Sequence, residues 1–392
     1  MNQFSFARQP ILTTNLQLYA YEFLYRPTKD AQHRSHSLTS EVLVSSIIDV
    51  GLDSATNDNL AFINMSYQDI MSPHINALPA DKIILELLED IALDEALISR
   101  VKELTEQGFR FALDDFIYSS DWDPLIELSD IIKLDLSVTS LEENKALVHK
   151  LKDTGTVFLA EKVETYNDFE AYKAIGCTLF QGYFLCKPEV IKGTTLSANS
   201  VSKSKLLSLI NQANISFDEL EETIEQDPSL TYTLLKYLNS AQFAFSNPIE
   251  SIKQAVVILG VDNIKKWATL VTLRNMSSKP SELLRLALVR ARLAELLAIG
   301  TQQSNSNRFF LSGLLSVLDA LLDAPLDSVI KSIALDPEIN MALLNHQGEI
   351  GQTLKLIKQY EREQPSNVDP NISDNYLEAC RWADQIMSTL QD

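Results

Sequence analysis

Residues 109–116 read FRFALDDF, an apolar run that ends in two adjacent aspartates. Such a run is typical of a short buried β-strand, and the acidic pair marks the point where the strand ends. Similar runs recur through the first half of the chain. They are FSFARQPIL (4–12), LYAYEFLY (18–25), LAFINMS (60–66), KIILELLE (82–89), IIKLDLS (131–137), VFLAEKV (157–163) and TLFQGYFL (178–185).

Helix-like segments lie between these runs, as in residues 94–107, where Leu97, Val101 and Leu104 have helical spacing. Strands that alternate with helices predict a mostly parallel sheet, and this many repeats favour its closure into an α/β TIM-like barrel. The first run can pair with the second across a turn at 13–15. We therefore expect the barrel to begin with a hairpin.

The 392-residue length predicts two domains. The barrel is expected over 1–192, and a linker rich in Ser, Thr and Lys over 193–203. Residues 204–392 are expected to form an all-α domain. Ser216 and Glu219, for example, have the spacing of a capping box at a helix start. Arg285, Arg290 and Arg292 of this domain are candidates for a partner surface, unless they are ordinary charges on a solvated helix face.

The composition is that of a globular protein, with 45% hydrophobic and 22% charged residues. A net charge of −20 argues against duplex nucleic acid as a partner, because such binders need a basic surface. We expect no membrane span or secretory signal, and the three cysteines are expected to be free thiols in a cytoplasmic protein. If a phosphate group is the ligand, metal ions must bridge it to this acidic protein.

Polar side chains recur late in the strand-like runs. They are Glu22, Asn64, Glu86, Glu89, Asp114, Asp115, Lys133, Asp135, Glu161, Glu164 and Gln181. The ends of parallel barrel strands meet at one face, where such barrels place their chemistry. A single one of these residues would be an ordinary loop residue, but the regular recurrence predicts a site.

Carboxylates together with an amide oxygen suit a hard cation such as magnesium, manganese or calcium. At a strand tip both Asp114 and Asp115 can turn inward, and one can bridge two ions of the kind that clamp a phosphodiester. A lysine there can orient water or offset developing charge. A glycosidase is the main rival, but it needs only two carboxyl groups and leaves Asn64 and Lys133 unexplained.

The series resembles the motifs of the EAL family of cyclic di-GMP phosphodiesterases. The matching segments are YEFLYR (21–26), FIN (62–64), LELLE (85–89), LDDF (113–116), KLD (133–135), AEKVE (160–164), and QGY (181–183) with KP (187–188). The resemblance implies cyclic di-GMP as ligand, its linear dinucleotide as product, and magnesium or manganese, with two ions expected.

The resemblance also implies roles for individual residues. The implied metal ligands are Glu22, Asn64, Glu86, Asp114 and Asp115. Glu161 is implied as a ligand or general base, and Lys133 and Gln181 as the residues that hold the attacking water. Arg26, Asp135 and Glu164 are the ligand-binding candidates, and Glu89 is expected to steady the loop after the Asp pair.

Three departures from the family pattern leave other functions open. Ile117 replaces a Gly after the Asp pair, Leu88 replaces a Thr, and Lys162 replaces a Gly beside Glu161. Ile cannot readily adopt the positive φ open to Gly, so the loop is expected to take another path. Lys162 either pairs with a carboxylate of the pocket, standing in for a metal, or points into solvent. A non-catalytic cyclic di-GMP sensor and a scaffold without nucleotide are the alternatives to an enzyme.

The second half resembles an HDOD domain, a non-catalytic relative of HD phosphohydrolases. The matching segments are DPSL (227–230), NS (239–240), IESIKQA (249–255) and LG (259–260). His346 is the only histidine after residue 149, so this half cannot build a histidine-rich metal centre. The whole chain resembles EAL–HDOD signalling proteins of the YuxH type. This implies an unidentified protein partner for the HDOD domain, and a homodimer is a candidate assembly.

Overall fold

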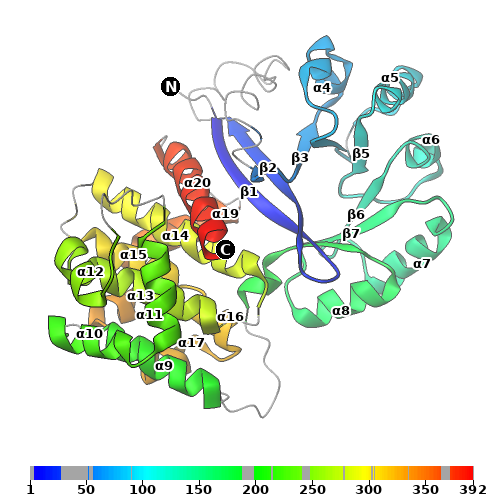
Figure 1. The fold of residues 1–392 in the computed structure, drawn as a ribbon. Helices are drawn as coiled ribbons and strands as arrows, with labels where there is room; N and C mark the ends of the chain where they lie inside the picture. Colours follow the sequence, from blue (N-terminus) through cyan, green and yellow to red (C-terminus); the bar gives the residue numbers. More distant parts are fainter. Residues whose placement is uncertain are drawn as a thin grey trace. The chain divides into compact units, whose positions relative to one another are not determined.

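The computed structural model describes residues 4–27, 52, 56–89, 91–187, 198–212, 215–240, 248–276, 279–301, 303, 305–333, 335–362 and 371–391. The chain forms two compact units, Met1–Leu185 and Cys186–Asp392. Within the described ranges, all the strands belong to the first unit and the second is helical (Figure 1). Among the described residues, no helix is long and apolar enough to cross a membrane.

The first unit is a closed eight-stranded barrel, as the sequence predicts. Its strands are β1 (Phe4–Thr13), β2 (Leu18–Pro27), β3 (Leu60–Met65), β4 (Ile83–Leu87), β5 (Arg110–Leu113), β6 (Ile131–Asp135), β7 (Val157–Glu161) and β8 (Leu179–Gln181). Strand β1 pairs antiparallel with β2 and with β8, and the other neighbouring pairs are parallel. The expected hairpin start is therefore confirmed.

Helices lie outside the barrel wall (Figure 1). They are α4 (Tyr67–Met71), α5 (Glu95–Glu106), α6 (Asp123–Ile126), α7 (Leu141–Leu151) and α8 (Tyr166–Ile175). In α5 the Asp94 side chain accepts a hydrogen bond of 2.8 Å from the Leu97 amide, which caps the helix start. Leu97, Val101 and Leu104 are fully buried, so one face of the helix anchors it to the barrel.

Two adjacent layers of side chains lie inside the barrel. The first is an apolar cluster with one residue per strand: Ile11, Ala20, Phe62, Ile84, Ala112, Ile131, Leu159 and Leu179. Side chains two residues apart on a strand share a face. The next inward position, toward the carboxyl ends of the parallel strands, is therefore two residues from each member of this cluster. Those positions form what we call the polar ring: Gln9, Glu22, Asn64, Glu86, Asp114, Lys133, Glu161 and Gln181. The apolar layer closes the barrel beneath the polar ring.

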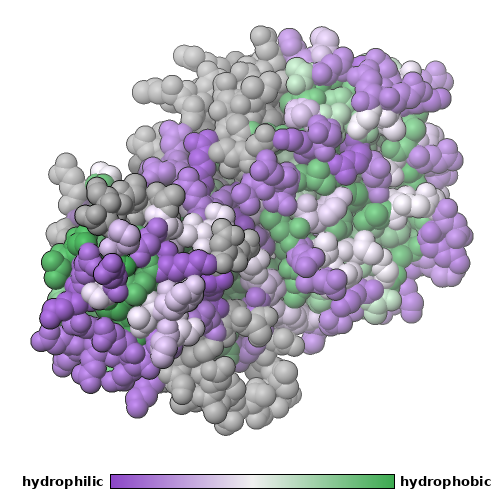
Figure 2. Space-filling model, in the orientation of Figure 1, coloured by the Kyte–Doolittle hydropathy of each residue, from purple (hydrophilic) through white to green (hydrophobic). Residues whose placement is uncertain are grey.

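The second unit contains only helices among its described residues. They are α9 (Ala198–Ile210), α10 (Phe217–Glu225), α11 (Pro228–Leu238), α12 (Ile252–Leu259), α13 (Val261–Met276), α14 (Ser281–Gly300), α15 (Ser306–Leu315), α16 (Leu318–Leu322), α17 (Leu326–Ser332), α18 (Pro337–Asn345), α19 (Gly348–Glu361) and α20 (Asn371–Gln391). The capping box of α10 forms as expected, with the Ser216 amide donating to Glu219 at 2.8 Å. Hydrophobic surface gathers over α12 (Figure 2), on which Val257 and Ile258 are exposed.

The structure corrects the interpretation of the arginines of α14. Arg285 and Arg290 are buried, so they form neither a partner surface nor a solvated helix face. The Arg290 guanidinium donates two hydrogen bonds to one Glu361 oxygen at 2.7 and 3.0 Å and one to the other at 2.9 Å. Arg285 pairs with Glu282 of its own helix at 2.8 Å and with Asp384 of α20. Both arginines therefore join helices within the core of this unit.

Candidate metal-binding site of the barrel

Lys133 lies at the centre of the polar ring. Its side chain is almost completely buried, with 1% of its surface exposed. Its Nζ lies 2.5 Å from Glu86, 2.6 Å from Glu161, 2.8 Å from Asp114 and 3.8 Å from Glu22. One ammonium thus faces four carboxylates from four strands or strand ends. Closure of the barrel brings together acidic side chains that are distant in the sequence.

Amide side chains complete the ring beside Glu22. Asn64 Nδ2 donates to Glu22 Oε1 at 3.4 Å, and Gln181 Nε2 donates to Glu22 Oε2. The same Gln181 nitrogen donates to Gln9 Oε1 at 3.1 Å. Gln9 is not among the residues predicted from the sequence, because its strand runs antiparallel. Its polar position therefore comes two residues before the apolar one, Ile11, instead of two after it.

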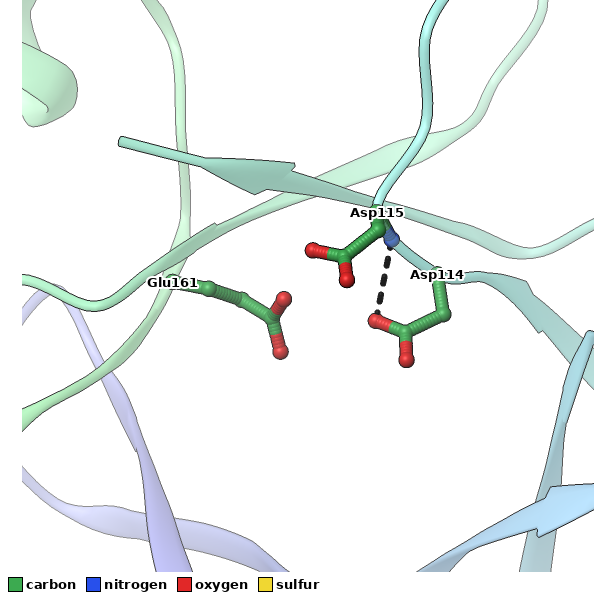
Figure 3. Close-up of side chains that lie close together, drawn as sticks. All are labelled: Asp114, Asp115 and Glu161. Atoms are coloured by element: carbon green, nitrogen blue, oxygen red, sulfur yellow. Dashed lines mark hydrogen bonds between the residues drawn. The ribbon is translucent and has the colours of Figure 1, made fainter. Parts of the chain in front are cut away.

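Asp114, Asp115 and Glu161 form the part of the site best placed to share a cation (Figure 3). Each offers a carboxylate oxygen, and these oxygens lie within 4.8 Å of one another. Asp115 follows the end of β5 with a left-handed φ of 44°, a conformation that Asp tolerates better than most residues. Figure 3 shows both aspartates directed toward Glu161. The left-handed turn removes the strand alternation that would point them to opposite faces.

The excess of negative charge shifts the ionisation of the buried groups. Burial raises the pKa of Glu86 and of Glu161 well above the usual range; the surrounding carboxylates add to this effect and Lys133 opposes it. Burial alone would lower the pKa of Lys133, but the carboxylates around it raise this pKa well above its usual value. Burial, together with the neighbouring Asp114, raises the pKa of Asp115 to about 6. The metal-free site therefore tends to retain protons.

Asp135 and Lys162 form a second charged contact at the edge of the site. Asp135 is buried, and its Oδ1 accepts hydrogen bonds from the Ser137 amide at 2.6 Å and hydroxyl at 2.7 Å. Its Oδ2 accepts from Lys162 Nζ. Burial works against ionisation, but these hydrogen bonds lower the pKa of Asp135. Of the two interpretations of Lys162, the structure shows the ion pair, although the lysine side chain is 57% exposed.

Several oxygens of the site are buried without a hydrogen bond among the described residues. They are Asn64 Oδ1, Glu86 Oε2, Asp115 Oδ1 and Gln181 Oε1. Buried polar atoms are rarely left unsatisfied, and a cluster of them at one place indicates a missing partner. All of them are hard oxygen donors beside further carboxylates. The donor set therefore fits a hard divalent cation such as magnesium or manganese.

The remaining predicted site residues are not members of the polar ring. Glu164 follows β7 and Glu89 follows β4, and both are exposed. Glu89 makes no hydrogen bond or ion pair with the described loop 116–124, so its role as a loop stabiliser stays a prediction. Arg26 lies on β2 opposite Ser5, and its side chain is outside the described part of the structure.

The loop after the Asp pair is held by aromatic packing. Phe116 and Trp122 are buried, and their rings meet edge to face with centroids 5.7 Å apart. Ile117 between them is 57% exposed. The residue at the position of the family glycine therefore points outward, while its neighbours fix the loop against the barrel.

Comparisons with known proteins agree with this architecture. The EAL domain model matches residues 2–188 and the HDOD domain model matches residues 198–323. The uncharacterized protein YuxH of Bacillus subtilis is 34% identical, over 97% of this chain and 98% of its own length. The chain belongs to the EAL–HDOD family. The first unit is thus an EAL domain, and the polar ring lies inside it.

A second full-length relative has a named activity. The cyclic di-GMP phosphodiesterase CdgJ of Vibrio cholerae is 31% identical, over 97% of this EAL–HDOD chain and 92% of its own length. Among solved structures, the calcium and cyclic di-GMP complex of Klebsiella pneumoniae BlrP1 matches with 19% identity and a TM-score of 0.40. That match covers 47% of this chain and 55% of BlrP1.

Proposed function

We propose that the EAL domain hydrolyses cyclic di-GMP to the linear dinucleotide with magnesium or manganese, two ions being held at full occupancy. The observation that carries this proposal is the polar ring, where buried carboxylate and amide oxygens have no hydrogen-bond partner within the described part of the chain. The named activity of the relative CdgJ supports the choice of substrate.

The ring residues have distinct parts in this proposal. Glu22, Asn64, Glu86, Asp114 and Asp115 would hold the ions. The bound ions would supply charge stabilisation for the phosphodiester oxygens and lower the pKa of a coordinated water.

Glu161 and Lys133 are suited to proton transfer and orientation. Burial raises the pKa of Glu161, so its carboxylate is a stronger base than that of an ordinary glutamate. Its carboxylate lies 2.6 Å from Lys133 Nζ, so the lysine fixes its position. Lys133 and Gln181 would orient the attacking water, and the Lys133 ammonium would offset the charge that develops on the phosphate.

Chromatography of the full chain incubated with cyclic di-GMP and Mg²⁺ or Mn²⁺ tests the proposal. We expect linear product from the parent chain, and a loss of about 10²- to 10³-fold in Glu22→Ala, which removes a carboxylate of the ring. Glu106→Ala, an exposed carboxylate on α5, is the matched control and should retain activity. Unchanged turnover in Glu22→Ala would contradict the assignment of the polar ring as the catalytic site.

A non-catalytic cyclic di-GMP sensor is the second candidate, in which the HDOD domain passes ligand occupancy to a protein partner. The observation in its favour is the Lys162–Asp135 ion pair at the edge of the ring. In this case calorimetry would show binding of intact cyclic di-GMP, while chromatography would show no linear product with either metal. For both candidates we propose the HDOD domain as the regulatory or partner-binding module. The exposed apolar residues of α12 support this role.

A further inference from the structure

Lys162 has an unusual backbone for its residue type. It directly follows Glu161 at the end of β7 and has a left-handed φ of 56°. This conformation disfavours residues with a Cβ atom, which is why glycine is the ordinary choice there. The chain instead carries a lysine at this position, with its ammonium directed to the edge of the metal-binding site.

The Lys162 ammonium lies between two carboxylates. It pairs with Asp135 Oδ2 and lies 4.0 Å from Asp115 Oδ1. Asp135 cannot easily turn away, because it is buried and Ser137 holds its other oxygen. Asp115 Oδ1 is buried and has no hydrogen bond among the described residues. The ammonium therefore pairs with a fixed carboxylate, Asp135, and lies within ion-pair distance of a second one, Asp115.

Asp115 also belongs to the group that can share a metal ion with Asp114 and Glu161. Strand pairing places Asp135 directly beside Glu161. The edge that Lys162 occupies is thus continuous with the cation site. A divalent ion that binds Asp115 and Asp135 would either displace the ammonium or be repelled by it. Lys133 faces Asp114 and Glu161 in every case, so Lys162 adds a competing cation only at the Asp115 edge.

We propose that Lys162 is a built-in cation that competes with the second divalent ion for Asp115 and Asp135. The inference deepens the proposed function and rests on it, since it concerns how fully the same site fills with metal. One ion then binds readily, and the second binds only at higher metal concentration. Because the second ion binds weakly, the activity of the EAL domain would depend on the metal concentration.

Mn²⁺ binding to the full chain, counted from the electron paramagnetic resonance signal of free Mn²⁺, tests this without measuring turnover. In the parent chain we expect one tighter and one weaker ion. Lys162→Met removes the charge but keeps most of the stem, and should tighten the weaker ion roughly three- to tenfold. The effect is modest because a half-exposed ion pair is partly screened. Lys162→Arg should behave like the parent chain.

Two more variants complete the design. Lys162→Gly removes the ammonium on a backbone that suits glycine, and it should tighten the second ion as Lys162→Met does. Lys152→Met removes an exposed lysine elsewhere on the barrel and should leave both ions unchanged. Equal binding of the second ion by the parent chain, Lys162→Met and Lys162→Gly would overturn the inference. So would tightening in Lys162→Arg, or no Mn²⁺ binding by any of the chains.

The outcome for the proposed function is read separately, from the linear product. Unchanged Mn²⁺ binding in Lys162→Met, together with turnover by the parent chain, would overturn the inference and leave the function standing. Tighter binding of the second ion without any linear product would support the inference and favour the sensor.

Discussion

The barrel and the helical unit both bury a cation, but they balance its charge differently. In the helical unit Arg290 meets Glu361 through hydrogen bonds of 2.7–3.0 Å, and a further bond of 3.2 Å goes to Ser316. In the barrel, Lys133 faces four carboxylates, and neighbouring oxygens are left unsatisfied. A cation matched by one carboxylate serves structure, whereas an excess of carboxylates prepares a site for additional cations.

The largest effect is expected where the charges are matched. Arg290→Met leaves Glu361 buried without its guanidinium, and should lower the free energy of unfolding of the helical unit by about 3–5 kcal/mol. Hydrogen exchange of peptides from α14 and α19 measures this, and Mn²⁺ should make no difference. Unchanged exchange in these helices would show that the pair contributes little.

The next effect concerns the unbalanced cluster. Lys133→Met should destabilise the barrel by roughly 2–4 kcal/mol in EDTA, less than the loss of Arg290, because Glu86 and Glu161 can take up protons. Mn²⁺ should restore part of this stability, since it binds the folded site and not the unfolded chain. Hydrogen exchange of β4 and β7 peptides with and without Mn²⁺ is the measurement. Lys152→Met is the control. A loss of stability in Lys133→Met that Mn²⁺ does not reduce would contradict a cation site.

A smaller effect follows from the raised pKa values of the barrel carboxyl groups. A carboxylic acid with a raised pKa holds its proton at a pH where an ordinary glutamate is ionised. Metal binding requires the ionised form, so Mn²⁺ should release at least about half a proton per chain at pH 6, where Asp115, with its pKa raised to about 6, is half protonated. Calorimetry in buffers of different ionisation enthalpy counts the protons. Zero release would mean that Glu86 and Glu161 are already ionised in the metal-free protein.

The smallest effect concerns a neutral member of the polar ring. Gln9→Ala removes the acceptor that holds Gln181 at 3.1 Å, at a cost of about 1 kcal/mol, or roughly fivefold in turnover. The rate of formation of linear product is the measurement, and Gln107→Ala, at the exposed C-cap of α5, is the control. Equal rates in Gln9→Ala and the parent chain would place Gln9 outside the functional part of the ring.

Much of the barrel could be predicted from the sequence because its signals are local. The alternation of strand-like and helix-like segments indicated the barrel, and the turn after residue 13 indicated the hairpin. Carboxylates recurring at strand ends indicated a cation site, because parallel strands end at one face. Gln9 was missed since the same pattern is reversed on an antiparallel strand.

Only the tertiary structure decided which charges meet. Nothing local in the sequence places Lys133 among four carboxylates, because those contacts join strands far apart in the chain. Arg290 has the same local surroundings whether its helix is exposed or buried, and packing against α19 decided the matter. The sequence thus determined the residue types and their faces, through the periods of strand and helix. Barrel closure and helix packing determined the partners, since burial and charge balance depend on neighbours distant in sequence.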